Sequence, residues 1–549
     1  MLTENQYEML GDRIAALYQA LEQDVIADIA RRVKRTGRFT ETAELMAKAM
    51  MQTGKSPTQI RKEVMKLLRA DTAYRKEVAA NTKQYKRDTI HKIRETEKAA
   101  AEMGNMLIAE AGDMSFNKDL WLWHQAGKTL TKDSAFVRLV EAMAEQTEGE
   151  LKNLTRTTGF KGVHGTIAVM NAYQNTLDKA LLKMTSGAFS FDRAAEDCVK
   201  ELAHSGLRRI NYASGRSYQL DTAARMCLRT GSAQLSAKIS MHNCDKTGVD
   251  LVEVDAHWGA RPEHAEWQGK IYSRSGKHEK YPDFAVCRYG EVDGLCGVNC
   301  RHSFYPFFEG ISEPNEWEPE PEPFEYRGKT YDYYQATQKQ RQMEREVRAT
   351  KREIEAAKAY GQDTKELNAE LRKQISEYHA FSKAAGIRPK DNRLRVIRGS
   401  SDLTKTNVYK TKKELEKQAE NDKIELERYK EMLKNRKIIV KDDNNRALSP
   451  TGDPNSITDL IGKDGKVYQR REYDSKGRSK VDYDTDDHGR PKYHPMGAHK
   501  HEFNYNNKNP RSGWKKLTEL DLVKNRDIIR KGDNYHLYFP GAFTTTLRM

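Results

Sequence analysis

Residues 255–307 constrain the fold of this chain more than any other stretch. They include three of the six cysteines, two of the six tryptophans and four of the fifteen histidines. The stretch lies between two long regions whose apolar residues recur at helical spacing. Residues of these kinds are seldom left exposed or without partners, so their concentration predicts a compact folded centre rather than a linker. We expect the rest of the chain to be attached to this centre.

Short strands are predicted in and just before the centre. Residues 248–254 alternate apolar and polar side chains, which is typical of a half-buried strand. Residues 267–272 favour a second strand, and a helix over residues 217–240 leads into both. We therefore predict a small α+β core over residues 205–312, in which the preceding helices pack against a small sheet.

Residues 1–204 carry the signals of successive helices. Thr3 with Gln6 predicts a capping box, and Ser56 begins a second start signal with Pro57 at the first helical position. Ser190 is a third predicted cap. Long charged helices need partners that bury one face. Those partners are either the other helices of a self-contained bundle or a neighbouring protein. The main helices are expected over residues 73–101, 134–154, 166–184 and 190–204.

Beyond the centre the composition changes at residues 313–330. Residues 313–325 contain four prolines and six glutamates, which favours an extended spacer and a domain boundary. Residues 331–440 return to helical spacing, with Glu and Lys/Arg interleaved on the remaining faces. This pattern predicts a coiled-coil-like helical arm, which either packs against other parts or turns a basic face to DNA.

Residues 457–549 are predicted to form a small basic α+β module. Residues 463–549 hold nineteen Lys and Arg against twelve Asp and Glu, a net charge of +7. Residues 467–473 and 481–483 favour a hairpin whose turn contains Gly477. The fold class predicted for the whole chain is therefore mainly helical α+β, with three or four units in 549 residues.

The net charge of the chain is +15 and its pI is near 9.2. Such a charge suits a polyanionic neighbour, or it is only a basic solvated surface. No apolar run approaches the roughly 18 residues that a spanning helix needs, so we expect no membrane-spanning segment. The first residues lack a cleavable signal pattern, so we expect synthesis in a cytoplasm. Cysteines are then expected as free thiols or metal ligands.

Two groups of residues could carry chemistry. The first could supply thiolate and imidazole ligands to a zinc ion, with Cys244 or His257 joining in space. It consists of Cys287, Cys296, Cys300 and His302. Its spacing is not a recurrent zinc-finger spacing, so buried structural thiols beside a hydrogen-bonded histidine are the alternative. Evidence for a catalytic cysteine is thin, because His302 is its only candidate partner.

The second group lies in the basic module and combines histidines with carboxylates. Its members are Asp484, Asp486, Asp487, His488, His494, His499 and His501. Cleavage of a phosphodiester, either assisted by a divalent metal ion or by a general base, requires this combination, and the local positive charge would hold a nucleic acid backbone. The alternative is a solvated histidine-rich loop. The chain has no phosphate-binding glycine loop and no nucleophile elbow, which disfavours an NTPase or an α/β hydrolase.

Several phrases of the centre occur together in one known family. HWGARPEHAEWQGKIY, then YPDF, then GLCGVNCRHSFYPF resembles the tailed-phage minor capsid protein 2 family, which is related to the Mu F-like head morphogenesis proteins. The resemblance covers roughly residues 1–310. It implies a virion protein with a non-enzymatic core, present in several copies inside the capsid near the portal and made in the host bacterial cytoplasm. The implied partners are the portal protein, the major capsid protein and packaged DNA, and the implied role is head assembly and DNA packaging or delivery.

A second resemblance concerns the C-terminal module. REYDSKGRSKVDYDTDDHGRPKYHPMGAHKH is similar to modules appended to phage head proteins and to polymorphic bacterial toxins. It implies an alternative function, in which a virion protein carries a nuclease-like toxin module. A plain DNA-binding scaffold ranks third. If the main resemblance holds, residues 1 to about 310 should suffice for incorporation into heads.

Overall fold

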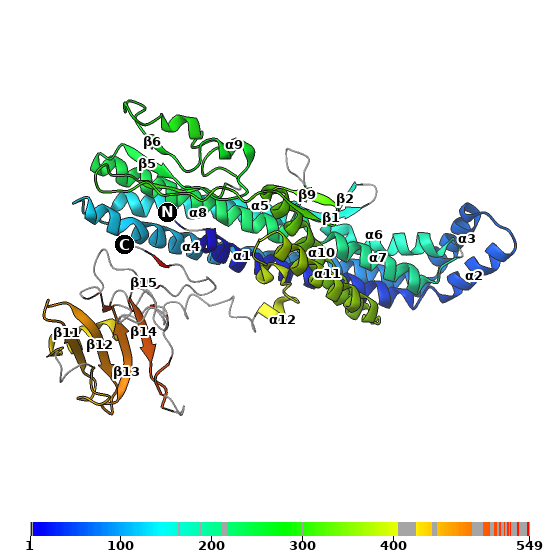
Figure 1. Cartoon of the computed structure of the whole chain (residues 1–549). Helices are drawn as coiled ribbons and strands as arrows, with labels where there is room; N and C mark the ends of the chain where they lie inside the picture. The colour runs from blue at the N-terminus through cyan, green and yellow to red at the C-terminus, as the bar shows by residue number, and fades with distance from the viewer. Residues whose placement is uncertain are drawn as a thin grey trace. The chain divides into compact units, whose positions relative to one another are not determined.

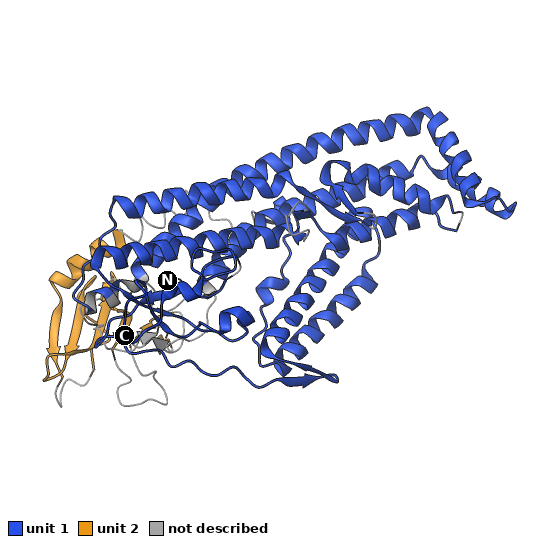
Figure 2. Cartoon of the chain, turned by 90° about the horizontal axis from the view of Figure 1, so that it is seen from above, with its two compact units in different colours: residues 1–409 blue, residues 410–549 orange. Residues whose placement is uncertain are grey.

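The computed structural model describes most of the chain. The positions outside the described part are residues 1, 3, 163–164, 187, 210–216, 299, 404–423, 442–446, 486–497, 506–509, 513–514, 516, 518–520, 522–523, 526–527, 529–534, 537–545 and 548–549. The chain divides into two compact units, Met1–Tyr409 and Lys410–Met549, which are coloured separately in Figure 2.

Long helices make up most of the first unit (Figure 1). They are α1 (Glu4–Gly37), α2 (Glu41–Gln52), α3 (Pro57–Ala70), α4 (Thr72–Gln125), α5 (Ser134–Arg156), α6 (Ala172–Met184), α7 (Phe191–Ser205), α8 (Leu220–Thr247), α10 (Tyr333–Tyr360) and α11 (Lys365–Ala384), with the single turns α9 (Pro262–Ala265) and α12 (Ser400–Leu403). Short 3-10 turns occur at Val169–Asn171, Phe284–Cys287 and Asp391–Leu394. In the part of the chain that the structure describes, no helix is long and apolar enough to cross a membrane.

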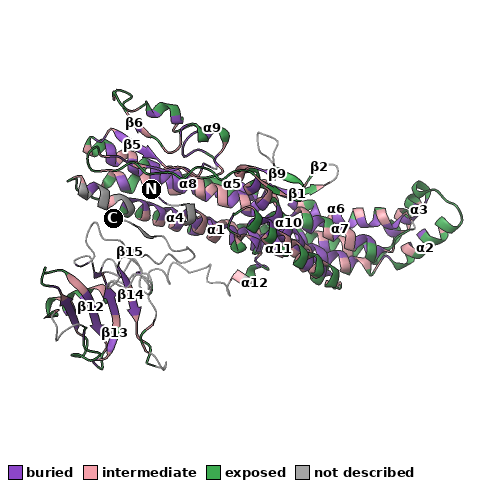
Figure 3. Cartoon of the chain, in the orientation of Figure 1, coloured by how far each residue is buried: buried purple, intermediate pink, exposed green. Residues whose placement is uncertain are grey.

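Helix α1 is the central helix of the first unit. It packs against α4, α6, α7, α8 and α10, and its apolar stripe is buried. The stripe consists of Leu10, Ile14, Leu17 and Leu21, at the spacing that predicts a helix here. The long helices therefore bury their apolar faces against one another, as the purple interior of Figure 3 shows. This packing is that of a self-contained bundle.

Two of the predicted helix caps are confirmed. The backbone N–H of Gln59 donates to Ser56 Oγ at 3.3 Å, and Gln59 Oε1 accepts from the N–H of Ser56 at 3.0 Å, which completes the capping box. Ser190 Oγ accepts from the N–H of Arg193 at 3.2 Å at the start of α7. The predicted cap at Thr3 lies outside the described residues.

Two predicted helix boundaries are wrong. The helix expected to end near residue 101 continues as α4 to Gln125. Gly104 and Gly112 lie on it where an added Cβ would be 2.8 Å from Leu151 and 3.0 Å from Val140 of α5, so these glycines permit helix packing instead of ending the helix. The helix expected from residue 166 begins only at Ala172, because β2 precedes it.

Three small sheets complete the first unit, and all their strand pairs are antiparallel. One has the order β2-β1-β3-β4 and contains β1 (Thr158–Gly162), β2 (Gly165–Ala168), β3 (Arg208–Arg209) and β4 (Tyr218–Gln219). The central one has the order β6-β5-β7 and contains β5 (Leu251–Val254), β6 (Ile271–Ser273) and β7 (Phe304–Pro306). The hairpin of β8 (Phe324–Tyr326) and β9 (Lys329–Tyr331) precedes α10.

The central sheet agrees with the two strands expected around residues 248–254 and 267–272. Val252 lies opposite Tyr272 on one side and Pro306 on the other, so β5 is the middle strand. Gly248 ends α8 with a φ of 72°, a left-handed conformation that glycine adopts without strain. The chain therefore turns directly from the long helix α8 into the middle of the sheet.

The arm is a helical hairpin that packs on the rest of the first unit. Helices α10 and α11 are joined at Gly361, whose φ is 90°, and share a small core with β8 and β9. Helix α10 also packs against α1 and α7. The tract of residues 313–323 has no regular structure, yet Asn315 donates its N–H to Glu253 Oε1 at 2.9 Å. The predicted internal boundaries of the first unit remain predictions.

The second unit is built on a five-stranded sheet with the order β10-β11-β12-β13-β14. The first two strands are parallel and the others antiparallel. The strands are β10 (Lys437–Val440), β11 (Ile457–Ile461), β12 (Val467–Tyr473), β13 (Ser479–Asp484) and β14 (His499–Glu502), with a separate pair β15 (Tyr535–His536) and β16 (Thr546–Leu547). Residues 424–434 are helical. The predicted β12–β13 hairpin, the helical first unit and these sheets confirm a mainly helical α+β fold.

Candidate metal centres

Three buried side chains meet beside the central sheet. His264 lies on the single turn α9, which Pro262 begins, and Cys300 and His302 lie just before β7. Asp255, at the end of β5, holds this second segment: its two carboxylate oxygens accept from the N–H of Ser303 at 2.7 Å and from its hydroxyl at 2.6 Å. The sheet therefore fixes the position of His302, the residue before Ser303.

The ligand atoms of these three residues form a small triangle. His264 Nδ1 and His302 Nδ1 are 3.4 Å apart, and Cys300 Sγ lies 3.8 Å from the first and 3.7 Å from the second. All three side chains are at most 4% exposed. A histidine and cysteine group of this size is large enough to accept one metal ion among its atoms.

Hydrogen bonds on the far side of each imidazole determine where its proton lies. His264 Nε2 is 2.8 Å from the carbonyl oxygen of Asp293, which can only accept. His302 Nε2 is 2.8 Å from Gln268 Oε1, and the same oxygen accepts from the backbone N–H of His257 at 3.1 Å. Both Nε2 atoms are therefore donors, so both Nδ1 atoms present lone pairs to the triangle.

The surroundings of the triangle are apolar and disfavour charge. The ring of Trp267 lies 4.6 Å from that of His264 and 4.8 Å from that of His302, between centroids. Burial lowers the pKa of His302 far below its ordinary value and lowers that of His264, while it raises the pKa of the Cys300 thiol. Without a bound cation all three groups are neutral at pH 7.

The sequence predicted part of this group. Cys300 and His302 lie in it, whereas Cys287 and Cys296 are buried outside the triangle. Burial raises the pKa of the Cys287 thiol to about 12, although a hydrogen bond with Tyr272 acts in the opposite direction. Cys296 Sγ lies 3.8 Å from the carbonyl oxygen of His302. His257 stacks on His302 with ring centroids 4.3 Å apart. Neither it nor Cys244 belongs to the triangle.

His264 is the member that the sequence reasoning missed. It stands in the quoted phrase HWGARPEHAEW, thirty-six residues before Cys300. The sequence signal that could have identified it is Pro262, which begins a helical turn and so fixes the backbone that carries His264 two residues later. Only the pairing of β5 with β7 brings that turn to Cys300, and such pairing is not visible in ligand spacing.

A second cluster lies on β13 and β14 in the second unit. Asp484 and His499 are opposite each other in the register, and His501 lies opposite Asp482. Asp484 Oδ2 is 3.8 Å from His499 Nε2 and 3.3 Å from His501 Nε2, and all three side chains are buried. The sequence predicted these three residues. The other predicted members, Asp486, Asp487, His488 and His494, lie outside the described residues.

The carboxylate of Asp484 has further partners. Gln469 Nε2 donates to Oδ1 at 2.7 Å, and Arg511 Nη2 donates to Oδ2 at 3.0 Å. Arg511 Nε also donates to Asp482 Oδ2 at 3.2 Å. Asp484 Oδ2, the oxygen that faces both histidines, therefore already binds the Arg511 guanidinium. The positive charge of that guanidinium would repel a metal ion at the same oxygen. The cluster is thus a buried hydrogen-bonded network to which a metal is less suited than to the first triangle.

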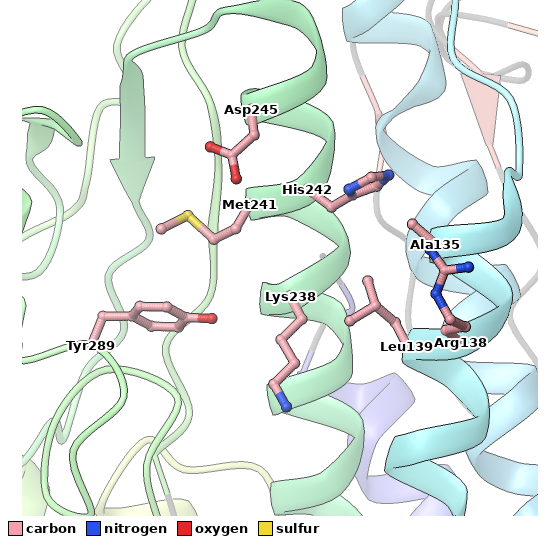
Figure 4. Close-up of a pocket in the computed structure, with 8 residues that line it drawn as sticks. All are labelled: Ala135, Arg138, Leu139, Lys238, Met241, His242, Asp245 and Tyr289. Carbon is pink, nitrogen blue, oxygen red and sulfur yellow. The ribbon is translucent and has the colours of Figure 1, made fainter.

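A shallow hollow of about 430 Å³ lies between α5, α8 and the loop that carries Tyr289 (Figure 4). Lys238, Met241 and His242 project into it from α8, and Arg138 and Leu139 from α5. His242 Nε2 is 3.2 Å from Asp133 Oδ2, and that carboxylate also accepts from Lys246 at 2.9 Å. The hydrogen bonds from Phe136, Lys246 and His242 lower the pKa of Asp133. The ion pair between Asp133 and His242 accounts for the position of this histidine without a bound ligand.

Comparisons with known proteins place these features in context. The sequence model of a family described as Phage minor capsid protein 2 matches residues 2–382, more than half of the chain. A relative described as "Structural protein" of Lactococcus phage LL-H is 25% identical over 205 residues, which are 36% of this chain and 55% of the relative. The chain thus spans about half the length of that relative. No solved structure matches. The family match includes the His264–Cys300–His302 triangle and ends before the second unit.

Proposed function

Because the chain belongs to the phage minor capsid protein 2 family, it is a minor structural protein of a phage virion, and we propose that it acts inside the head close to the portal. Its proposed role is head assembly together with packaging or delivery of the DNA. The proposed partners are the portal protein, the major capsid protein and packaged DNA, with several copies of this chain in each virion. Synthesis in the host bacterial cytoplasm is part of the same proposal.

The observation that carries this proposal is the family match over residues 2–382. It covers nearly all of the first unit, including α10 and most of α11.

The test of this role is incorporation of a truncated chain into heads. The sequence resemblance predicts that residues 1–310 suffice. The structure favours Met1–Tyr409 as the fragment, because α10 supplies Arg352 and Arg348 to the buried carboxylates of Glu22 and Asp221. We expect heads assembled with Met1–Tyr409 to contain it at the level of the full chain, as measured by mass spectrometry of purified particles.

The matched control is the fragment Lys410–Met549, which is expected to be absent from the same particles. Cross-linking in intact heads should then join the first unit to the portal protein. Exclusion of a folded Met1–Tyr409 fragment from heads would contradict the proposal. Cross-links only to other head proteins would remove its portal-proximal part and leave the structural role.

A second function is proposed for the C-terminal unit, that of a nuclease-like module carried by the virion. The observation that favours it is the group of Asp484, His499 and His501, whose ligand atoms lie within 4.8 Å of one another. Residues 463–549 also carry a net charge of +7. Chemistry at this group requires nucleic acid to reach side chains that the fold buries. Binding is therefore the first property to test.

The fragment for this test is Lys410–Met549, because β10 pairs with β11 and the Tyr429 hydroxyl donates to Asn525 at 2.6 Å. If phosphate contacts dominate, DNA and RNA should both bind with little sequence preference, and affinity should fall steeply as salt rises. Absence of binding at low salt would sink the proposal.

Cleavage is measured in the same samples with and without a divalent ion. It should be lost in His499→Ala, His501→Ala, His488→Ala and His494→Ala while binding is retained, since chemistry and phosphate binding rest on different residues. Lys437→Ala is the matched control, because Lys437 forms an exposed ion pair away from the cluster. Binding without cleavage would contradict the catalytic part alone.

A further inference from the structure

We propose that His264, Cys300 and His302 bind one zinc ion, through the Nδ1 atoms of both histidines and the Sγ atom of the cysteine. The ion would lie beside the central sheet of the first unit and link the single turn α9 to the segment before β7. The proposal concerns this chain's own residues and stands apart from the role of the protein in the virion.

The size of the triangle fits tetrahedral zinc. Zinc–nitrogen bonds of about 2.0 Å and zinc–sulfur bonds of about 2.3 Å at tetrahedral angles separate two nitrogens by about 3.3 Å, and a nitrogen from a sulfur by about 3.5 Å. The observed separations are 3.4 Å between the nitrogens and 3.7 and 3.8 Å from the sulfur to each nitrogen. The three atoms therefore match one face of a zinc tetrahedron to within a few tenths of an ångström.

The orientation of the imidazoles gives an independent argument. Asp293 O and Gln268 Oε1 accept from the two Nε2 atoms, so the protons are on the far side of both rings. Two Nδ1 lone pairs then face each other at 3.4 Å in a buried site, an arrangement that repels unless a cation lies between them. Hydrogen bonds from the outer nitrogen of a histidine to a carbonyl or amide oxygen are the usual support of a metal-bound histidine.

The chemistry of the donors selects the kind of ion. Calcium and magnesium take oxygen ligands, and this triangle offers none. Two imidazoles and one thiolate suit zinc, which accepts nitrogen and sulfur together in four-coordinate sites. Binding converts the Cys300 thiol to a thiolate and releases one proton. The fourth position is left for water.

The ion would stabilise a part of the fold that has little regular structure. Between Ser273, the end of β6, and Phe304, the start of β7, the described residues form only the 3-10 turn Phe284–Cys287. Zinc bonds from His264 to Cys300 and His302 would link the two ends of a loop that contains this segment. Cross-links that close long loops of the unfolded chain stabilise the folded one.

The experiment uses the full chain, purified with zinc present and dialysed against metal-free buffer. Elemental analysis should find one zinc ion per chain. That ion should be lost in His264→Gln and in Cys300→Ser. The double variant His499→Gln/His501→Gln should keep it, which separates this site from the cluster on β13 and β14. Cys287→Ser is the matched control, since Cys287 is an equally buried thiol outside the triangle and should also keep the ion.

Cobalt substitution identifies the ligands without relying on a variant that folds. Cobalt added to the metal-free wild-type chain should give the charge-transfer absorption of a thiolate ligand together with the visible bands of a four-coordinate site. Hydrogen exchange across residues 255–303 should slow when zinc is restored. A wild-type chain that binds no zinc would overturn the proposal. It would also be overturned by cobalt bands without thiolate charge transfer, or by folded Cys300→Ser that still holds one zinc at this site.

Discussion

Arg348 and Arg352 are buried charged residues of helix α10, which packs against α1 and α7. Arg352 Nε donates to the carbonyl oxygen of Ala203 at 2.9 Å and lies 3.8 Å from Glu22 Oε2. Arg348 Nε lies 3.8 Å from Asp221 Oδ2, which also accepts from Gln19 at 3.0 Å. Buried pairs of this kind add little net stability, but removing one partner leaves a charge without compensation.

A pH dependence follows from Asp221. Burial opposes its ionisation, but the charges of Arg348 and Arg225 and the hydrogen bond from Gln19 outweigh it, so the pKa of Asp221 is lowered. Its stabilising contribution is therefore present above the unfolded-state pKa of about 3.9 and is lost as the pH falls through the lower folded pKa. We expect Asp221→Asn to destabilise the first unit most at pH 7 and progressively less below pH about 4.

The measurement is the free energy of unfolding of Met1–Tyr409, with and without Asp221→Asn, across this pH range. Asp133→Asn is the comparison: that carboxylate is also lowered in pKa, by hydrogen bonds, but lies on the surface, so its effect should be smaller throughout. A constant difference between wild type and Asp221→Asn from pH 7 to the acid end would refute the assignment.

Residues whose signals are local were the ones that the sequence could predict. Ser56 and Ser190 were found because a cap acts on backbone atoms two or three residues away. His264, Arg348 and Arg352 were not found, because their partners are far away along the chain. The alternation of Glu with Lys and Arg in α10 favours solvated charges, but the packing of that helix against α1 and α7 helps to bury Glu344, Arg348 and Arg352.

Strand β12 presents a buried positive charge to each face of the sheet, and the neighbouring strands supply the opposite charges. Arg470 and Arg471 are consecutive, so their side chains leave on opposite faces. Arg470 forms a two-point ion pair with Asp459 of β11 at 2.7 and 2.8 Å, and Arg471 forms one with Asp482 of β13 at 2.5 and 2.7 Å. All four residues are buried, and each pair is directly opposite in the strand register. Both pairs therefore fix the register of the sheet.

We expect Arg470→Ala to destabilise the second unit by about 3 to 5 kcal/mol, because it leaves the buried carboxylate of Asp459 without its main partner. Arg470→Met should be milder, since the side chain fills the same volume, although Asp459 still loses its ion pair. Lys437→Ala removes an exposed ion pair with Asp453 and should change stability by less than about 1 kcal/mol. Chemical denaturation of Lys410–Met549 gives all three values. Equal effects of Arg470→Ala and Lys437→Ala would contradict this account.

The kinds of elements were predicted better than their ends and partners. The hairpin of β12 and β13 and the strand β5 follow from alternation, which is a local pattern. Strands β1 to β4 were not predicted: they are short, and β3 and β4 have only two residues each. A pairing of that length leaves almost no periodic signal, and it forms because the helices around it hold the chain ends together.

For the whole molecule, the two compact units predict two separate unfolding events. The first unit has one large core that runs from α1 to the central sheet, and the second has its own smaller cores, around Tyr483 and around Tyr429. Calorimetry of the full chain should therefore show two transitions, and the fragments Met1–Tyr409 and Lys410–Met549 should each reproduce one. A single transition that neither fragment reproduces would show that the units depend on each other.

The central position of α1 has a consequence for how this protein is made. Helix α1 leaves the ribosome before α8 and α10, against which it packs and which begin at Leu220 and Tyr333. At roughly 5 to 20 residues per second, the last of these partners appears tens of seconds after α1. Until α8 emerges, α1, with the buried Ile14 and Ile29, lacks its final cover from both helices, and until α10 emerges it still lacks the cover from α10. We therefore expect a chaperone or transient helix pairing to cover this face until α10, which ends at Tyr360, has emerged, so that a subunit becomes ready for assembly only when most of it exists.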